Sequence, residues 1–73
     1  MKLFAFNGHL LAKHRITDIY TCYNNRSKKA GIIVELDTGK KYTKWIIEDN
    51  YNNSIIECNI LLHELVIELQ RDD

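Results

Sequence analysis

The side chains best able to do chemistry in this 73-residue chain are two cysteines and three histidines. A histidine next to Cys22 could accept its proton and leave a nucleophilic thiolate. However, Cys22 lies in a run of β-branched and aromatic residues and Cys58 in a periodic apolar segment, where cysteine is usually a small buried hydrophobe. His9 and His14 fall in different local structures, whereas the histidine pairs of zinc sites share one turn or helix. We therefore expect no catalytic residue, no metal and no cofactor.

Motifs for phosphate binding and for hydrolysis are missing from the sequence. Its three glycines each fit a turn or a strand end, and they form neither a phosphate loop nor a Gly-x-Ser-x-Gly element. Glu64 and Glu68 lie one helical turn apart, but a solvated acidic stripe explains them more simply than a general acid and base. The sequence therefore predicts a protein that is not an enzyme.

The equal numbers of basic and acidic residues, 10 of each, hide a division along the chain. Residues 1–47 carry a net charge of +6 and residues 48–73 a net charge of −6. The isoelectric point of about 6.8 argues against nucleic acid, yet the basic half alternates cations with aromatic rings that could stack on bases. Single-stranded nucleic-acid binding by a sheet face is therefore one hypothesis. Its candidate residues are Tyr23, Lys28, Lys29, Lys41, Lys44 and Trp45.

The hypothesis that the sequence favours is binding to a protein. A C-terminal helix would carry one broad apolar arc for the sheet and a second, separate strip of isoleucines beside an acidic stripe. Exposed aromatic and aliphatic side chains of the sheet are typical anchors of interfaces. The candidate interface residues are Ile33, Trp45, Ile56, Glu57, Ile60, Glu64, Ile67 and Glu68. The alternative is that these side chains all belong to one core.

The length allows one domain, residues 1–73, with a sheet half at about 2–47 and a helix at about 54–70. A domain of this size is marginal alone, and two cysteines make at most one disulfide, so we expect a homodimer. The apolar start is too short for a signal peptide, and no run is long enough to span a membrane. These features predict a cytoplasmic protein without a membrane partner.

Turn residues divide the sheet half into strands. Asn7-Gly8 predicts a hairpin between residues 2–6 and 9–12, and residues 16–23 are typical of a strand. Residues 30–47 form the clearest hairpin, closed by Asp37-Thr38-Gly39 with a bulge at the glycine. This register pairs Val34 with Tyr42 and places Ile33 and Trp45 on one face, whereas a two-residue loop would exchange the faces of the second strand.

The helix is expected to begin with a capping box formed by Ser54 and Glu57 and to end near Gln70. The fold class is therefore α+β, a two-layer domain with a small antiparallel sheet of three to four strands followed by one helix packed on it. The composition, rich in isoleucine, asparagine and lysine and without proline, is typical of AT-rich coding. Together these features predict an accessory or inhibitory protein of a phage or mobile element, which acts by stoichiometric binding to a protein.

Overall fold

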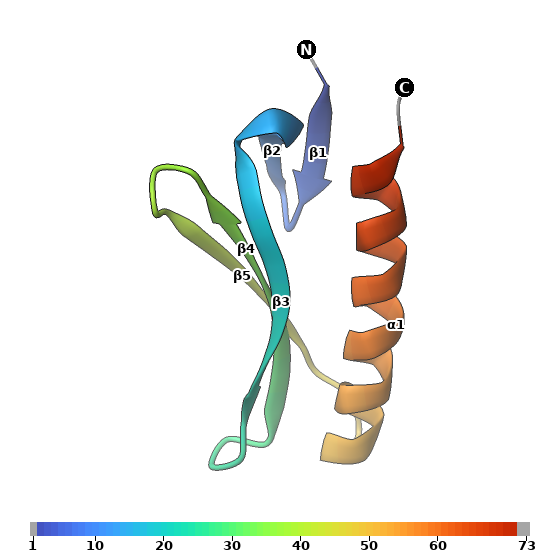
Figure 1. Ribbon diagram of the computed structural model, residues 1–73. Coiled ribbons are helices and arrows are strands. Elements are labelled where there is room, and N and C mark those ends of the chain that lie inside the picture. Colours follow the sequence, from blue (N-terminus) through green and yellow to red (C-terminus); the bar gives the residue numbers. More distant parts are fainter. Residues whose placement is uncertain (1, 72–73) are drawn as a thin grey trace.

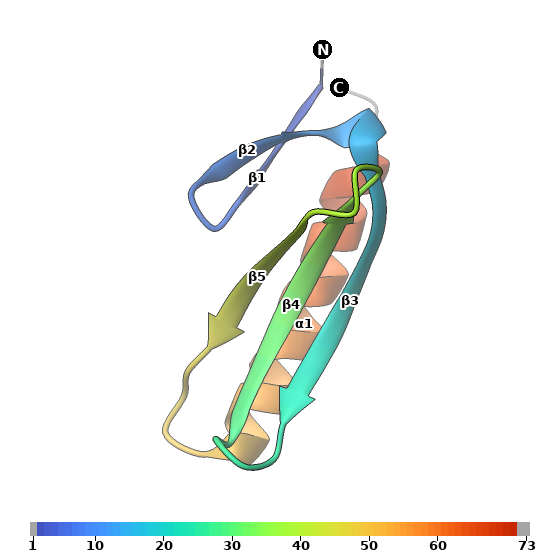
Figure 2. The ribbon, with the colours of Figure 1, turned by 90° about the vertical axis from the view of Figure 1, so that its left-hand side faces the viewer.

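The computed structural model describes residues 2–71 and confirms the α+β fold (Figure 1). An antiparallel sheet in the order β3-β4-β5 carries the C-terminal helix on one face. A separate two-stranded sheet, β1-β2, lies at the end of the domain near the C-terminus of α1 and extends to the side past β5 (Figure 2). The elements in chain order are β1 (Leu3–Phe6), β2 (His9–Ala12), a 3₁₀ turn (Lys13–Arg15), β3 (Ile16–Asn24), β4 (Lys29–Leu36), β5 (Lys41–Ile46) and α1 (Tyr51–Gln70).

The β4-β5 hairpin has the register that its loop predicts. Val34 pairs with Tyr42 and Glu35 with Lys41, and the Leu36 N–H donates to the Lys40 carbonyl at 2.9 Å. Gly39 has a φ of +88°, a conformation that glycine adopts at little cost. The bulge at this glycine therefore sets which side chains of β5 face the helix.

The predicted Asn-Gly hairpin is also confirmed. Asn7 and Gly8 both have positive φ, 48° and 83°, as a type I′ turn requires. The hairpin does not extend the main sheet but turns Phe4 and Phe6, with ring centroids 6.3 Å apart, toward the core. Its tip reaches β5, where the Asn7 side-chain amide donates to the Thr43 carbonyl at 3.3 Å.

The core lies where the β1-β2 hairpin, the main sheet and α1 meet. Alternation along β4 sends Ala30, Ile32 and Val34 toward the helix, and all three are fully buried. The remaining fully buried or nearly buried apolar residues are Phe4, Phe6, Leu11 and Cys58. The predicted apolar arc of the helix packs around them through Ile55, Leu62, Leu65 and Leu69, joined by Leu61.

The helix begins earlier than the capping box predicts, so that expectation is wrong in detail. Asn50 is the N-cap, and its side-chain oxygen accepts the Asn53 N–H at 2.8 Å. Ser54 lies inside the first turn and is buried; its hydroxyl accepts the Glu48 N–H and donates to the Asn50 carbonyl. The earlier asparagine therefore takes the capping role, and the serine joins the preceding loop to the helix.

Candidate protein-interaction surfaces

The face of the main sheet that α1 does not cover is the first candidate surface (Figure 2). Alternation and the strand register place three cross-strand rows on it, Asp18–Glu35–Lys41, Tyr20–Ile33–Thr43 and Cys22–Gly31–Trp45. We call this surface the open face. In the view of Figure 2 it is turned toward the reader, with α1 behind the sheet.

Trp45 is the largest side chain of the open face, and Gly31 determines how it lies. A Cβ on Gly31 would stand 2.8 Å from the Trp45 Cε3 atom, so the indole ring rests on the glycine backbone. Trp45 remains 43% exposed, while Ile33 on the next row is half-buried. The open face therefore offers a partly exposed aromatic side chain that lies against the Gly31 backbone.

The charges of the open face balance. The Tyr20 hydroxyl lies 3.4 Å from Glu35 Oε1, and the Lys41 Nζ lies 3.9 Å from the same oxygen. Asp18 shares this row, and Lys29 falls on the same face because it precedes Gly31 by two residues. Two cations and two anions leave no positive groove for a phosphate backbone.

The structure does not bring the candidate nucleic-acid residues together. Lys29, Lys41 and Trp45 lie on the open face. Lys44, in contrast, pairs with buried Ile32 and Tyr23 with buried Ala30, on the helix side of the sheet. The Tyr23 hydroxyl donates to Asn59 of α1 at 3.2 Å. Lys28 and Lys29 lie where β3 turns into β4, and the Lys28 Nζ stands 5.7 Å from the centre of the Tyr51 ring.

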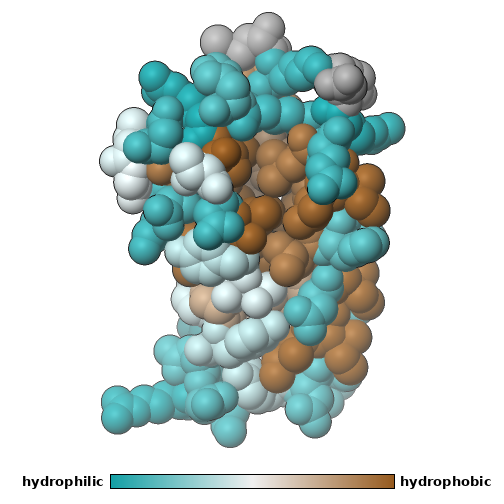
Figure 3. All heavy atoms as spheres, viewed as in Figure 1, coloured by the Kyte–Doolittle hydropathy of each residue, from teal (hydrophilic) through white to brown (hydrophobic). Residues whose placement is uncertain are grey.

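The second candidate surface is the strip of isoleucines along the outer side of α1, which remains uncovered as the sequence predicts. Ile56, Ile60 and Ile67 are 54%, 49% and 50% exposed. Figure 3 shows apolar atoms along the side of α1 that faces away from the sheet, with polar atoms beside them. We call Ile56, Ile60, His63 and Ile67 the outer strip; His63 is also exposed.

The acidic residues predicted beside the outer strip differ in their surroundings. Glu57 and Glu64 are exposed and make no ion pair within the described residues. Glu68 is half-buried and accepts a hydrogen bond from Arg71 at 3.1 Å. Only Glu57 and Glu64 therefore remain available to a partner.

A third uncovered surface escaped the sequence interpretation. Leu3 and Ala5 of β1, with Leu10 of β2, point away from the core on the outer side of the hairpin, and Leu10 is 69% exposed. The unbroken apolar runs Leu3–Phe6 and Leu10–Ala12 could have revealed it, because strands with both faces apolar are normally covered on both sides.

Cys22 and Cys58 lie on opposite sides of Gly31 and are both free thiols. The Cys58 Sγ donates to the Gly31 carbonyl at 3.2 Å from the helix side, while Cys22 shares the open face with Gly31. Burial raises the pKa of the Cys22 thiol. The pKa of Cys58 is also raised, mainly by burial and to a smaller extent by the charge of the Cys22 thiolate. Both thiols are therefore protonated at neutral pH and are poor nucleophiles.

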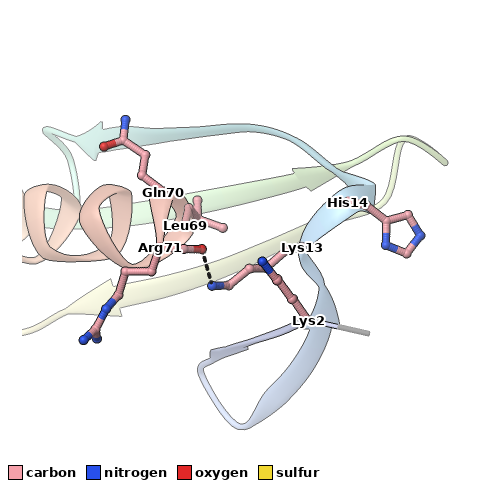
Figure 4. Close-up of a pocket in the computed structure, with 6 residues that line it drawn as sticks. All are labelled: Lys2, Lys13, His14, Leu69, Gln70 and Arg71. Atoms are coloured by element: carbon pink, nitrogen blue, oxygen red, sulfur yellow. Dashed lines mark hydrogen bonds between the residues drawn. The ribbon is translucent and has the colours of Figure 1, made fainter. Parts of the chain in front are cut away.

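A hollow of about 370 Å³ lies at the C-terminal end of α1 (Figure 4). Lys2, Lys13 and His14 line it from the β1-β2 side, and Leu69, Gln70 and Arg71 line it from the helix. The Lys13 Nζ donates to the Glu68 carbonyl at 3.0 Å and to the Arg71 carbonyl at 3.5 Å. Lys13 thus caps the end of the helix, a favourable position for a cation.

Residues 2–71, the part of the chain that the structure describes, contain no cluster of three metal-ligating side chains. No helix among them has the length and apolarity to cross a membrane. Comparisons with protein-family models, with curated proteins and with solved structures found no match to this chain.

Proposed function

We propose that this chain is a non-enzymatic, cytoplasmic protein-binding module that acts by stoichiometric binding, as an accessory or inhibitory protein of a phage or mobile element. It would self-associate through the open face and bind a different protein through the outer strip. The observation that carries the proposal is the outer strip itself, with three isoleucines each about half exposed on one side of α1. Soluble monomers rarely leave contiguous apolar surface uncovered, and such patches usually mark interaction sites.

The division of roles between the two surfaces follows from their charges. The open face carries Lys29 and Lys41 together with Asp18 and Glu35, so two copies related by a twofold axis can place opposite charges against each other. The outer strip is flanked by glutamates, which would repel those of a second copy packed antiparallel on it. Self-association through the open face would give a four-layer arrangement with the two helices outside.

The nucleic-acid alternative has weaker support. Its residues are divided between two faces, and the open face has no net positive charge among its charged side chains. The observation in its favour is the basic turn between β3 and β4, which contains Arg26 and Lys28, with the Tyr51 ring against Lys28. Binding through this turn should weaken steeply as the salt concentration increases, because lysine and arginine side chains that bind phosphates displace counterions from the nucleic acid.

Capture from host lysate, with and without nuclease, tests the proposal. The parent protein is compared with Trp45→Ala and with a double variant in which Glu57 and Glu64 are changed to Lys. We expect a nuclease-resistant protein partner that the double variant loses, while circular dichroism shows an intact fold. Capture that disappears with nuclease would support the alternative, and capture unchanged by either variant would contradict the proposed surfaces.

Light scattering tests the homodimer separately. We expect the apparent mass to rise from that of one 8.6 kDa chain toward twice that value with increasing concentration. A mass that stays at one chain across the micromolar range would contradict self-association, and it would leave binding by the outer strip to be judged from the capture experiment.

A further inference from the structure

The side chains along the outer side of α1 indicate which kind of protein segment would bind there. We propose that the outer strip binds an amphipathic helix of the partner protein whose apolar seam is flanked by lysine or arginine. This inference rests on the proposed function and makes it specific.

The spacing of the outer strip fits a helix. Ile56, Ile60, His63 and Ile67 follow one another at intervals of four, three and four residues, the repeat of the contact positions of a coiled coil. At a rise of about 1.5 Å per residue, the strip extends about 16 Å along α1. A helix laid along it can place its own apolar side chains between these four residues.

The charges beside the strip decide which helix fits. In this repeat Glu57 and Glu64 occupy equivalent positions on the same flank, one heptad apart. α1 contains three glutamates and neither lysine nor arginine over its 20 residues. A cationic helix would therefore meet carboxylates that no cation of α1 neutralises.

A second copy of α1 is a poor occupant of the same strip. In an antiparallel pair, the glutamates on the flank of one copy would face those of the other. In a parallel pair, Glu57 and Glu64 would face Asn52 and Asn59, which carry no charge. Neither arrangement pairs Glu57 and Glu64 with an opposite charge, whereas lysines or arginines at the facing positions of a partner helix would.

Two synthetic helical peptides of about three heptads test the inference, both with leucine at the contact positions. The first has lysine at every flanking position, and the second has glutamate there. Each is added, up to about 1 mM, to the isotope-labelled full chain at low salt, and amide shifts locate the binding site. We expect shifts concentrated at residues 56–67, and binding of the lysine peptide at least about tenfold tighter than of the glutamate peptide.

Charge reversal on the chain distinguishes pairing with Glu57 and Glu64 from an effect of the net charge of the protein. A Glu57→Lys, Glu64→Lys variant should reverse the preference between the two peptides. The matched control is Asp37→Lys with Glu48→Lys, because both residues are exposed, lie outside α1 and change the net charge equally. The control should keep the preference of the parent.

The inference is overturned if the lysine peptide shifts no amide of α1 up to the highest concentration. It is also overturned if both peptides bind equally, or if the control variant reverses the preference as the helix variant does. The proposed function fails on a different result, the absence of any captured protein partner. Capture lost in Trp45→Ala but kept in the helix variant would retain binding to a protein. It would move the partner site from the outer strip to the open face and remove this inference.

Discussion

At the scale of the residue, Gly31 connects the two sides of the main sheet. Its missing side chain lets the Trp45 indole lie on the open face, and its carbonyl accepts the Cys58 thiol on the helix side. A glycine inside a strand usually costs stability, and one that an aromatic ring covers recovers part of the lost packing. The position of the main anchor of the open face therefore depends on a single residue.

We expect Gly31→Ala to destabilise the fold by about 1–3 kcal/mol, the usual cost of forcing an extra methyl group into a packed site. The added Cβ would stand 2.8 Å from Trp45 Cε3 and 3.0 Å from the Lys44 carbonyl oxygen. Urea unfolding measures the loss. In a Trp45→Ala background the alanine should cost less, because only the backbone contact remains, and strictly additive losses would contradict this account.

The two thiols lead to a pH dependence of stability at high pH. Their pKa values in the folded protein lie above the ordinary value of 9.0, so the unfolded chain loses these protons first as the pH rises. The free energy of unfolding should therefore fall above about pH 9. A Cys22→Ala, Cys58→Ala variant is expected to show a smaller fall between about pH 8 and pH 10.5 in urea titrations. Equal falls in parent and variant would exclude the thiols as the cause.

At the scale of the element, the sequence predicts best where backbone conformation restricts residue type. Asn7-Gly8 and Gly39 adopt positive φ, and the strands of both hairpins that they close begin and end within one residue of the predicted positions. The helix start is predicted less well, because several asparagines and a serine compete for one cap and only packing decides among them. Ser54 is buried against the loop at Glu48, which leaves the cap to Asn50.

Which face of the sheet a side chain occupies is harder to predict from the sequence. The positions of Tyr23 and Lys44 on the helix side depend on the pairing of β3 with β4 and of β4 with β5. The first pairing contains an irregularity between Ile16 and Asp18, and one extra residue in a strand exchanges the faces of all that follow. The candidate protein-interface residues are found on exposed or half-buried positions because they depend on the helix period and on the β4-β5 loop alone.

We expect Asn50→Ala to cost about 1 kcal/mol of stability, because it removes the side-chain acceptor for the Asn53 N–H. Asn52→Ala is the matched control, since Asn52 is exposed in the same turn and caps no amide. It should be neutral or slightly stabilising, because alanine has the higher helix propensity. Chemical unfolding compares the two variants, and equal stabilities would exclude Asn50 as the cap.

At the scale of the whole molecule, the basic and acidic parts of the sequence occupy different regions of the structure. The acidic helix lies on one side of the main sheet, while the open face on the other side carries balanced charges. Many of the remaining cations lie between strands, in the 3₁₀ turn Lys13–Arg15 and at Arg26 and Lys28 in the turn between β3 and β4. A dimer formed through the open faces would present two outer strips, and a partner with two basic helices would gain avidity from both.

Such a dimer should make thermal stability depend on concentration, because association favours the folded state by mass action. We expect the melting temperature of the parent to rise by several degrees between about 5 and 500 µM. Ile33→Thr keeps a β-branched residue in the strand but places a hydroxyl on the open face, and it should abolish the dependence. Leu10→Thr makes a similar change on the outer side of the hairpin, where Leu10 is 69% exposed, and it should retain the dependence of the parent. A melting temperature independent of concentration in the parent would exclude the dimer, and a dependence lost in Leu10→Thr would move the self-contact from the open face to the hairpin.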